Sequence, residues 1–407
     1  MSNERSGFSS RLGFVLATAG SAVGLGNIWR FPYLAAKYGG GTFLLTYLIL
    51  TLTFGFSLMI TEVALGRKAG TSAIRAFGHF SKKYTFIGYL TTIIPFIIFP
   101  YYCVIGGWVT KYALLSIQGG IHNAASDTFF TGFISKSAEP MICVLVFLIA
   151  TTVVVVGGVK GGVERVSTIM MPVLIVLLIG VSLFCITRPG AMAGVVYYLK
   201  PNLKGFSPTT ILAALGQLFY SMSLAMGIMI TFGSYMPKKA DLEKSVTQVE
   251  IFDTGVAFLA GLMIVPAVFA FSNGDSSMLA KGPSLMFVML PKVFDSMAFS
   301  SVIAAVFFIL VLLAALTSSI SLLETLVAVL MDKFHMKRGT ACITMFIIAL
   351  LLAVPSSLGF GAWSNITILG FDFLDFFDFI SNSVLMPIAA FLTCLFVGYI
   401  IKPKSNC

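Results

Sequence analysis

The stretch TAGSAVGLGNIWRFPY, residues 18–33, decides the fold because it interrupts an apolar run where a membrane span is expected. Its glycines are followed by an asparagine, an arginine and a proline. Glycine weakens a helix interior by roughly 0.5–1 kcal/mol, and proline kinks or breaks it. The sequence therefore predicts a first span that is broken at its centre, with Asn27 and Arg30 beside the break.

The composition places the whole chain in a membrane. Of its 407 residues, 58% are hydrophobic and 10% are charged, and the mean hydropathy is +0.98. Soluble domains carry about 25% charged residues. A span needs roughly 20 apolar residues and must satisfy its own backbone hydrogen bonds, so helices are expected. The net charge of +10 comes from basic residues in short loops, which indicates membrane orientation rather than nucleic-acid binding.

Ten apolar runs are long enough to be transmembrane helices, so we predict an all-α polytopic membrane protein. The basic residues concentrate in alternate loops, and the positive-inside rule then places both termini in the cytoplasm. The short loops suggest a bacterial inner membrane. The expected spans run over 11–37, 42–66, 85–117, 141–157, 165–187, 208–236, 244–272, 297–331, 340–355 and 376–401.

A second span is interrupted like the first. GQLFYSMSLAMG, residues 216–227, places serines and glycines in an apolar run five spans after the first break. The odd offset means that the two broken spans cross in opposite directions, as in transporters built from inverted repeats. Small residues that merely let helices pack closely are the alternative. We expect one domain over 1–407, with a 5+5 inverted repeat over about 11–187 and 208–401, and helices 1 and 6 discontinuous.

The cysteines and histidines give no evidence of catalysis or of a metal centre. The cysteines are scattered without CxxC spacing, and most lie in expected spans, where they act as small packing residues. The three histidines lie in loops, and no nucleophile–base pair is recognisable, so an enzyme is not expected. The six cysteines are Cys103, Cys143, Cys185, Cys342, Cys394 and Cys407.

Five motifs, in order and spacing, resemble the neurotransmitter:sodium symporter family, which has the LeuT fold. The resemblance extends along nearly the whole chain and implies a sodium-driven transporter without an organic cofactor. Family members usually have eleven or twelve spans, whereas ten are expected here, and this leaves a homodimer open. The motifs are GSAVGLGNIWRFPY (20–33), GGG (39–41), TEVALGR (61–67), GQLFYSMSL (216–224) and ALTSS (315–319).

The first break offers ligands of two kinds. The backbone amides of Leu25 and Gly26 begin a half-helix and can hold a carboxylate, while free carbonyls suit a hard cation. All-oxygen shells fit Na⁺ better than zinc or copper. The resemblance implies one sodium site from the Ala22 carbonyl, Asn27, Ser221, Asp253 and the substrate carboxylate, and a second from the Gly20, Val23 and Ala314 carbonyls with the Thr317 and Ser318 hydroxyls.

Asp253 lies inside the seventh span, where a carboxylate is costly without a cation or a proton. Many family members carry Asn at this position and balance the charge with chloride or with another acid, whose position here is Ala257. We therefore expect Asp253 to bind sodium and to make transport independent of chloride. A shifted register that turns Asp253 toward a water-filled vestibule is the alternative.

The resemblance also indicates the substrate. Gly24 stands where amine-transporting relatives carry an acid, which leaves room for an α-carboxylate, and Tyr102 matches the tyrosine that binds it. The mostly apolar lining predicts a hydrophobic or aromatic amino acid. The expected substrate contacts are Ala22, Gly24, Leu25, Gly26, Ile98, Tyr102, Phe219, Tyr220, Ser221, Ser223, Ala225, Met226, Ser318, Ser319 and Leu322.

Two gates are implied as well. The outer gate pairs Arg30 with an acid of FDFLDFFDFISN (371–382), above Tyr220 as an aromatic lid. Counting back from Pro387 favours Asp378, with Asp375 left open. The inner gate and its support involve Arg5 paired with Asp332, Tyr235 beside them, and Glu62 as a buried brace for the sixth span.

The residues and the resemblance together predict sodium-coupled amino-acid symport by alternating access. The amino-acid substrate and the lipid bilayer are the expected partners, and two sodium ions are the expected cofactors. A proton-coupled transporter or exchanger of the same fold, with Asp253 carrying the proton, is one alternative. A sensor that binds substrate without transport is the other.

Overall fold

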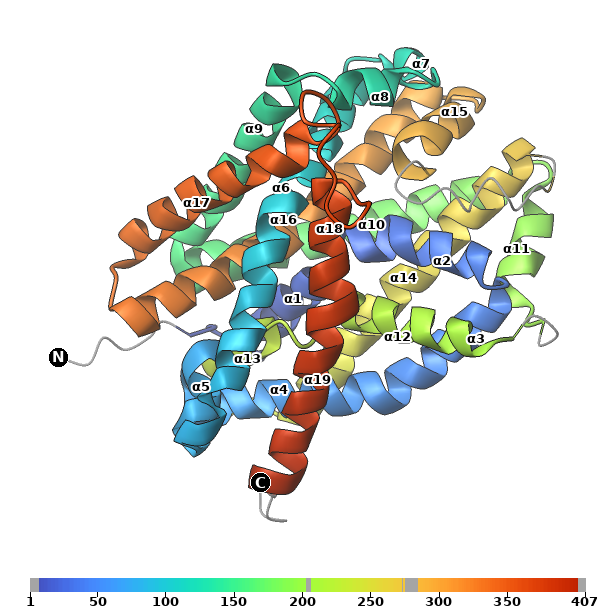
Figure 1. Ribbon diagram of the computed structural model, residues 1–407. Helices are drawn as coiled ribbons and strands as arrows, with labels where there is room; N and C mark the ends of the chain where they lie inside the picture. Colours follow the sequence, from blue (N-terminus) through green and yellow to red (C-terminus); the bar gives the residue numbers. More distant parts are fainter. Residues whose placement is uncertain (1–6, 203–205, 273, 275–284, 402–407) are drawn as a thin grey trace.

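A computed structural model describes residues 7–202, 206–272, 274 and 285–401 of the chain (Figure 1). Within this described part, eight helices are long and apolar enough to cross a membrane, or nine if one bent pair counts as a single span. The eight continuous spans contain α3 (Gly41–Leu50) with α4 (Phe56–Ala69), α6 (Thr85–Ile117), α9 (Ala138–Val156), α10 (Arg165–Ile186), α14 (Leu242–Ser272), α16 (Ser300–Phe334), α17 (Arg338–Leu358), and α18 (Phe373–Asp378) with α19 (Met386–Leu395).

The bent pair is the predicted first span. Helix α1 (Arg11–Ala22) and the helix Gly26–Lys37, which contains α2 (Phe31–Lys37), meet at an angle of 53° across a short break. The predicted sixth span is also broken, into α12 (Pro208–Ser221) and α13 (Ile228–Tyr235). Two discontinuous helices in an all-helical, polytopic membrane protein are therefore confirmed. The count of eight or nine is lower than the ten predicted spans because the pieces of the sixth span, of 14 and 8 residues, are each too short to be counted.

The second break has an unusual backbone. Ser223 and Ala225 have φ values of 52° and 60°, in the left-handed region that residues other than glycine rarely adopt, and Gly227 has φ 72°. Such strain is maintained only when the surroundings fix it. The Glu62 carboxylate of α4 provides one such constraint, because its Oε1 accepts a 2.9 Å hydrogen bond from the Ala225 amide.

Several segments expected to be loops form short helices instead. Helix α5 (Ala73–Phe80) lies in the basic loop after the second span; it buries Ile74 and Phe77 and exposes Arg75 and His79. This amphipathic pattern covers too few residues for a clear sequence signal. The others are α7 (Ile121–Ala124), α8 (Phe129–Ile134), α11 (Ala191–Leu199) and α15 (Leu290–Asp295).

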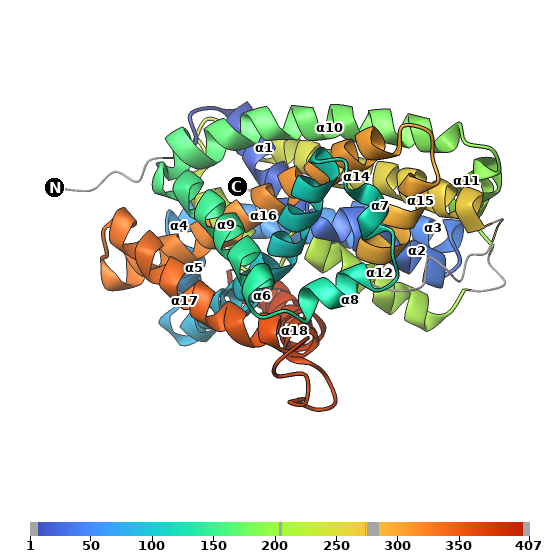
Figure 2. The same cartoon turned by 90° about the horizontal axis from the view of Figure 1, so that it is seen from above.

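Helix α1 lies inside the molecule, in contact with α10, α14 and α16 (Figures 1 and 2). Other helices distant in sequence also pack side by side, such as α6 with α16 and α4 with α13. The two breaks are therefore surrounded by protein, where unpaired backbone groups are tolerated at membrane depth. The five described cysteines are free thiols, four of them buried, as expected for packing residues.

Candidate functional site

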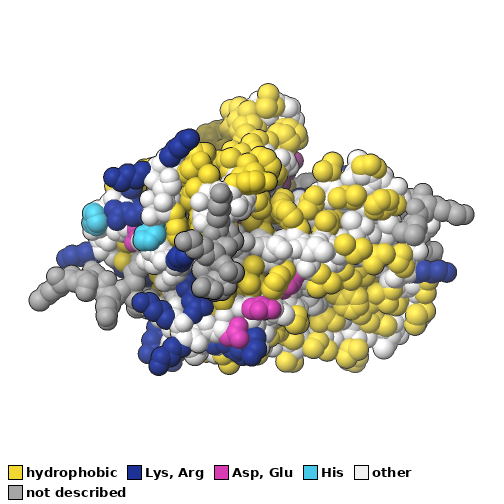
Figure 3. Space-filling view, turned by 90° about the horizontal axis from the view of Figure 1, so that it is seen from below, with side chains coloured by type: hydrophobic (Ala, Val, Ile, Leu, Met, Phe, Trp, Pro, Cys, Tyr) yellow, Lys and Arg dark blue, Asp and Glu magenta, His cyan; other side chains and the backbone are white. Residues whose placement is uncertain are grey.

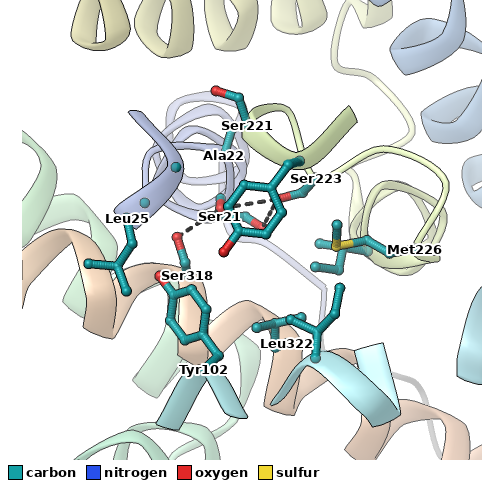
Figure 4. A pocket seen from close by; sticks show the side chains of 14 residues that line it. Ser21, Ala22, Leu25, Tyr102, Ser221, Ser223, Met226, Ser318 and Leu322 are labelled. Carbon is teal, nitrogen blue, oxygen red and sulfur yellow. Dashed lines mark hydrogen bonds between the residues drawn. The ribbon is translucent and has the colours of Figure 1, made fainter. Parts of the chain in front are cut away.

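A pocket lies where the two broken helices meet α6 and α16 (Figure 4). Twelve of the fifteen predicted substrate contacts line it, and Ser21 and Ile228 line it in addition. Ile228 begins α13 directly after the break, and the Ser21 carbonyl accepts a 3.1 Å hydrogen bond from the Ser223 hydroxyl across the two breaks. The complete lining is Ser21, Ala22, Gly24, Leu25, Gly26, Ile98, Tyr102, Tyr220, Ser221, Ser223, Met226, Ile228, Ser318 and Leu322.

Phe219, Ala225 and Ser319 do not line this pocket, so their predicted contacts with the substrate stay predictions. The Phe219 ring packs edge-on against Phe54, with centroids 5.8 Å apart. The Ser319 hydroxyl lies 2.8 Å from that of Thr151 on α9, and Ala225 is held by Glu62. Phe219 and Ser319 are each next to a lining residue, and neighbours on a helix point about 100° apart.

The glycines of the first break allow side chains of other helices to lie close to its backbone. A Cβ on Gly24 would lie 2.5 Å from the Ser318 hydroxyl and 3.2 Å from that of Tyr102. A Cβ on Gly26 would lie 2.6 Å from the Tyr220 ring. Side chains at these two positions would therefore fill the pocket.

Polar and apolar groups are separated within the pocket. The buried Tyr102 hydroxyl lies near Ser318 and the Leu25 backbone but forms no hydrogen bond of good geometry in the described part of the chain. Figure 4 shows Tyr102 next to Ser318, and Met226 across the pocket from Leu25. The apolar part consists of Ile98, Met226, Ile228 and Leu322. An unpaired buried hydroxyl beside backbone amides can bind an anionic group, and the apolar part can hold a hydrocarbon group.

Oxygen atoms of α16 and of the end of α1 lie close together beside this pocket. The Ser318 Oγ lies 3.4 Å from the Gly20 carbonyl oxygen and 3.2 Å from that of Val23. The Thr317 Oγ1 lies 3.1 Å from the Ala314 carbonyl oxygen, and a Cβ on Gly20 would lie 3.3 Å from the Thr317 Cβ. This set contains only oxygen and therefore fits a hard cation.

A second polar cluster surrounds Asp253, which is fully buried. Its Oδ1 accepts hydrogen bonds from Asn27 Nδ2 at 2.7 Å and from Ser221 Oγ at 2.9 Å, and its Oδ2 accepts one from Tyr47 at 3.4 Å. No basic side chain pairs with it among the described residues. Asn27 Oδ1 accepts a 3.1 Å bond from the Gly24 amide, which connects the cluster to the break. The sequence motifs did not indicate Tyr47.

Arg30 and Asp378 lie beside the pocket but do not form the predicted ion pair. Arg30 donates to Gln217 Oε1 at 3.1 Å, and its guanidinium lies 5.3 Å from the Tyr220 ring centroid. Asp378 accepts instead from Tyr101 at 3.1 Å and from Asn382 at 2.6 Å. The Arg30 guanidinium and the Asp378 carboxylate each contact other residues, so the ion pair between them is absent from this conformation.

Asp375 does not replace Asp378 as a partner of Arg30. No ion pair joins Asp375 to Arg30 within the described ranges. The Asp375 backbone amide donates a 2.9 Å hydrogen bond to the Asp372 side chain, which caps the start of α18. Asp372 therefore has a structural role, whereas Asp378 contacts Tyr101 of α6.

The predicted inner gate lies only partly within the described residues. Arg5 lies outside the described residues, so its pairing with Asp332 stays a prediction. Asp332 accepts a 2.7 Å hydrogen bond from the Ser72 amide. Tyr235 donates at 2.9 Å to Glu324 Oε1.

Glu324, for which the sequence indicated no role, is fully buried and forms an ion pair with Arg338 at the start of α17. Arg338 also donates to the Val155 carbonyl at 2.8 Å, which ties α9 to the same network. Glu324 and Arg338 belong to two different helices, α16 and α17, and to no common motif. Their pairing could therefore not be predicted from the sequence.

Nearly the whole chain matches one known family. The model of the sodium:neurotransmitter symporter family matches residues 5–131 and 130–406. The sodium-dependent transporter YhdH of Bacillus subtilis strain 168 is 36% identical, over 96% of this chain and 87% of its own. A sodium-dependent transporter of Haemophilus influenzae is 35% identical, over 99% of this chain and 91% of its own.

A solved structure is similar as well. The crystal structure of MhsT in complex with L-phenylalanine superposes on this chain with a TM-score of 0.89 and 40% identity, over 97% of this chain and 90% of that one. This match confirms the LeuT fold expected from the motifs. The protein is a multi-pass, sodium-dependent transporter rather than an enzyme, and the chain belongs to the sodium:neurotransmitter symporter family.

Proposed function

We propose that the protein couples sodium entry to the uptake of an amino acid with a hydrophobic or aromatic side chain. The observation that carries this proposal is the meeting of three features at the two breaks. These are the unpaired Tyr102 hydroxyl, the apolar end of the pocket and the two oxygen clusters. The likeness to MhsT, whose crystal structure contains L-phenylalanine, supports the same class of substrate.

The substrate carboxylate binds at the first break. Tyr102 donates its hydroxyl hydrogen to the carboxylate, and the Leu25 and Gly26 amides at the start of the half-helix add two more donors. Gly24 leaves the space open, since a Cβ there would collide with Ser318. The substrate side chain then packs against Ile98, Met226, Ile228 and Leu322.

Two sodium ions bind beside the substrate. One is held by the Ala22 carbonyl with Asn27, Ser221 and Asp253, and the substrate carboxylate completes its shell. Ion and substrate therefore bind better together than separately, which couples their transport. The Asp253 carboxylate supplies the negative charge for this ion, so chloride is not required. The second ion is held by the Gly20, Val23 and Ala314 carbonyls with the Thr317 and Ser318 hydroxyls.

Alternating access follows from the two repeats, which we place at about 11–187 and 208–401. Spans 1, 2, 6 and 7 move against the remainder and open the pocket to one side at a time. The positive-inside rule places both termini in the cytoplasm. Arg30 and Asp378 lie at the outer side of the pocket, and Asp332 and Tyr235 lie at the inner side.

Uptake by proteoliposomes tests the proposal. Radiolabelled phenylalanine, leucine, glutamate and a decarboxylated amine are offered with an inward sodium gradient, and with choline in place of sodium. We expect sodium-dependent accumulation of the first two only. Accumulation that follows a proton gradient without sodium would instead establish a proton-coupled transporter. Saturable binding without accumulation would establish a sensor.

A further inference from the structure

A second cavity, of about 430 Å³, lies at the basic end of the molecule, far from the breaks in sequence. It is formed by the loop before α5, by α5 itself, by the start of α6 and by the end of α16. Figure 3 shows that Lys and Arg side chains gather at one end of this face, with histidine among them. The lining residues are Thr71, Ile74, Arg75, Gly78, His79, Thr85, Tyr89 and Lys333.

The lining carries positive charge and no acidic side chain. Arg75 and His79 are four residues apart on α5 and so lie on one face of that helix. The Arg75 side chain forms no ion pair or hydrogen bond with the described residues, which leaves its guanidinium free for a ligand. The Lys333 amine is held in place from α16, since it donates to the Tyr89 hydroxyl at 2.6 Å and lies 5.2 Å from that ring's centroid.

Two neutral features complete a site for an anion. The Thr71 Oγ1 is buried at the cavity without a hydrogen-bond partner in the described part. Gly78 keeps the floor open, because a Cβ there would lie 2.8 Å from the Thr85 hydroxyl oxygen. A guanidinium, an ammonium and an unpaired hydroxyl around one cavity match the acceptor oxygens of a phosphate.

The surface beside the cavity indicates a lipid rather than a free anion. Phe86, Tyr89 and Ile93 of α6 are 51%, 46% and 47% exposed and form one stripe along this membrane span. Tyr89 belongs both to the stripe and to the cavity lining. Acyl chains that lie along the stripe therefore place their headgroup at the cavity.

We propose that this cavity binds the phosphate headgroup of an anionic phospholipid of the inner leaflet. The headgroup joins Arg75 on α5 to Lys333 on α16. The two neighbouring residues, Ser72 and Asp332, already connect the same segments through their 2.7 Å hydrogen bond. A bound lipid thus adds a second connection between the α5 segment and the end of α16. The assignment to the inner leaflet rests on the proposed orientation, with both termini in the cytoplasm, and not on which substrate is carried.

Lipid binding to the purified full-length protein in detergent tests the proposal. Native mass spectrometry measures the occupancy by phosphatidylglycerol, by phosphatidylcholine with the same acyl chains, and by inorganic phosphate. We expect phosphatidylglycerol to bind at least tenfold more tightly than the other two. Arg75→Gln and Lys333→Gln should each weaken its binding about fivefold, as expected for one basic residue near an anionic headgroup.

Lys239→Gln is the matched control, because Lys239 is an exposed lysine that does not line the cavity. It should change the binding less than twofold, and Arg75→Lys should retain most of it. Equal losses in all three glutamine variants would overturn the proposal in favour of unspecific attraction. Inorganic phosphate that binds as tightly as the lipid would overturn the assignment to a headgroup.

Discussion

At the scale of single residues, Asp253 supplies the one protein carboxylate among the proposed sodium ligands. Asp253→Asn keeps the size of the side chain and removes its charge. Because a hydrogen bond or ligand contact to a charged group is worth about 1.5–3 kcal/mol, we expect the sodium affinity to fall roughly 10- to 150-fold. Binding of ²²Na⁺ to the purified protein measures this change.

The exposed carboxylate Asp241, just before α14, provides the control, and Asp241→Asn should leave the sodium affinity unchanged. Uptake by the wild type should also proceed at the same rate when gluconate replaces chloride. A steep dependence of wild-type uptake on chloride would contradict the role of Asp253 as the fixed negative charge.

Tyr102 allows a test of carboxylate binding at the same scale. Tyr102→Phe removes only the hydroxyl, so we expect the substrate to bind about 10- to 150-fold more weakly, as for a lost hydrogen bond to a charged group. Tyr112→Phe is the control, because the Tyr112 hydroxyl is buried but donates to the Phe287 carbonyl outside the pocket. Equilibrium binding of labelled substrate distinguishes the two variants, and equal losses would refute the assignment.

At the scale of helical elements, Glu62 holds the second break in its strained conformation. Glu62→Gln keeps the acceptor for the Ala225 amide, whereas Glu62→Leu leaves this buried N–H unpaired at a cost of about 1–3 kcal/mol. We expect the leucine variant to melt earlier in detergent and to bind substrate more weakly than the glutamine variant. Identical melting temperatures for the two variants would show that Glu62 does not brace the break.

The contacts of Glu324 on α16 with Tyr235 of α13 and Arg338 of α17 give a second prediction at the scale of helices. Removing one partner of a buried ion pair costs about 3–5 kcal/mol, and less where a partner is partly exposed. The Arg338 side chain is 20% exposed and that of Glu324 is 0% exposed. Arg338→Gln should therefore lower the melting temperature clearly more than Lys337→Gln, which changes an exposed neighbour. An equal effect of both would mean that the pair adds nothing to stability.

The elements also show what the sequence can and cannot predict. Glycines and polar residues inside apolar runs are a local signal, so both breaks were predictable. Helix α5 was not predicted because its eight residues form only about two turns, too few for its one-sided apolar pattern to be recognised in the sequence. Phe219 and Ala225 are absent from the pocket lining for different reasons. Phe219, inside α12, packs against Phe54, whereas Ala225 lies beyond the end of α12 at Ser221, where helical spacing no longer applies. The contacts of Arg30 depend on packing between distant spans, which no single stretch contains.

At the scale of the whole molecule, both oxygen clusters adjoin the pocket at the two breaks, and the two sodium sites proposed there predict the number of charges moved. A zwitterionic amino acid carried with two sodium ions moves two positive charges in each cycle. Each charge that crosses 100 mV contributes about 2.3 kcal/mol, which corresponds to an accumulation of about 50-fold. Two sodium ions should thus allow accumulation of roughly 2,000-fold at equal sodium concentrations on both sides.

Proteoliposomes with a valinomycin-imposed potassium potential of about −100 mV measure this ratio directly. The accumulation should fall to one when the potential is abolished, since sodium is balanced across the membrane. The double variant Thr317→Ala/Ser318→Ala, which removes the hydroxyls of the second oxygen cluster, should lower the plateau from about 2,000-fold toward about 50-fold if the first site still couples. A wild-type plateau near 50-fold would mean that only one net charge moves, and the proposed two-ion cycle would then be wrong.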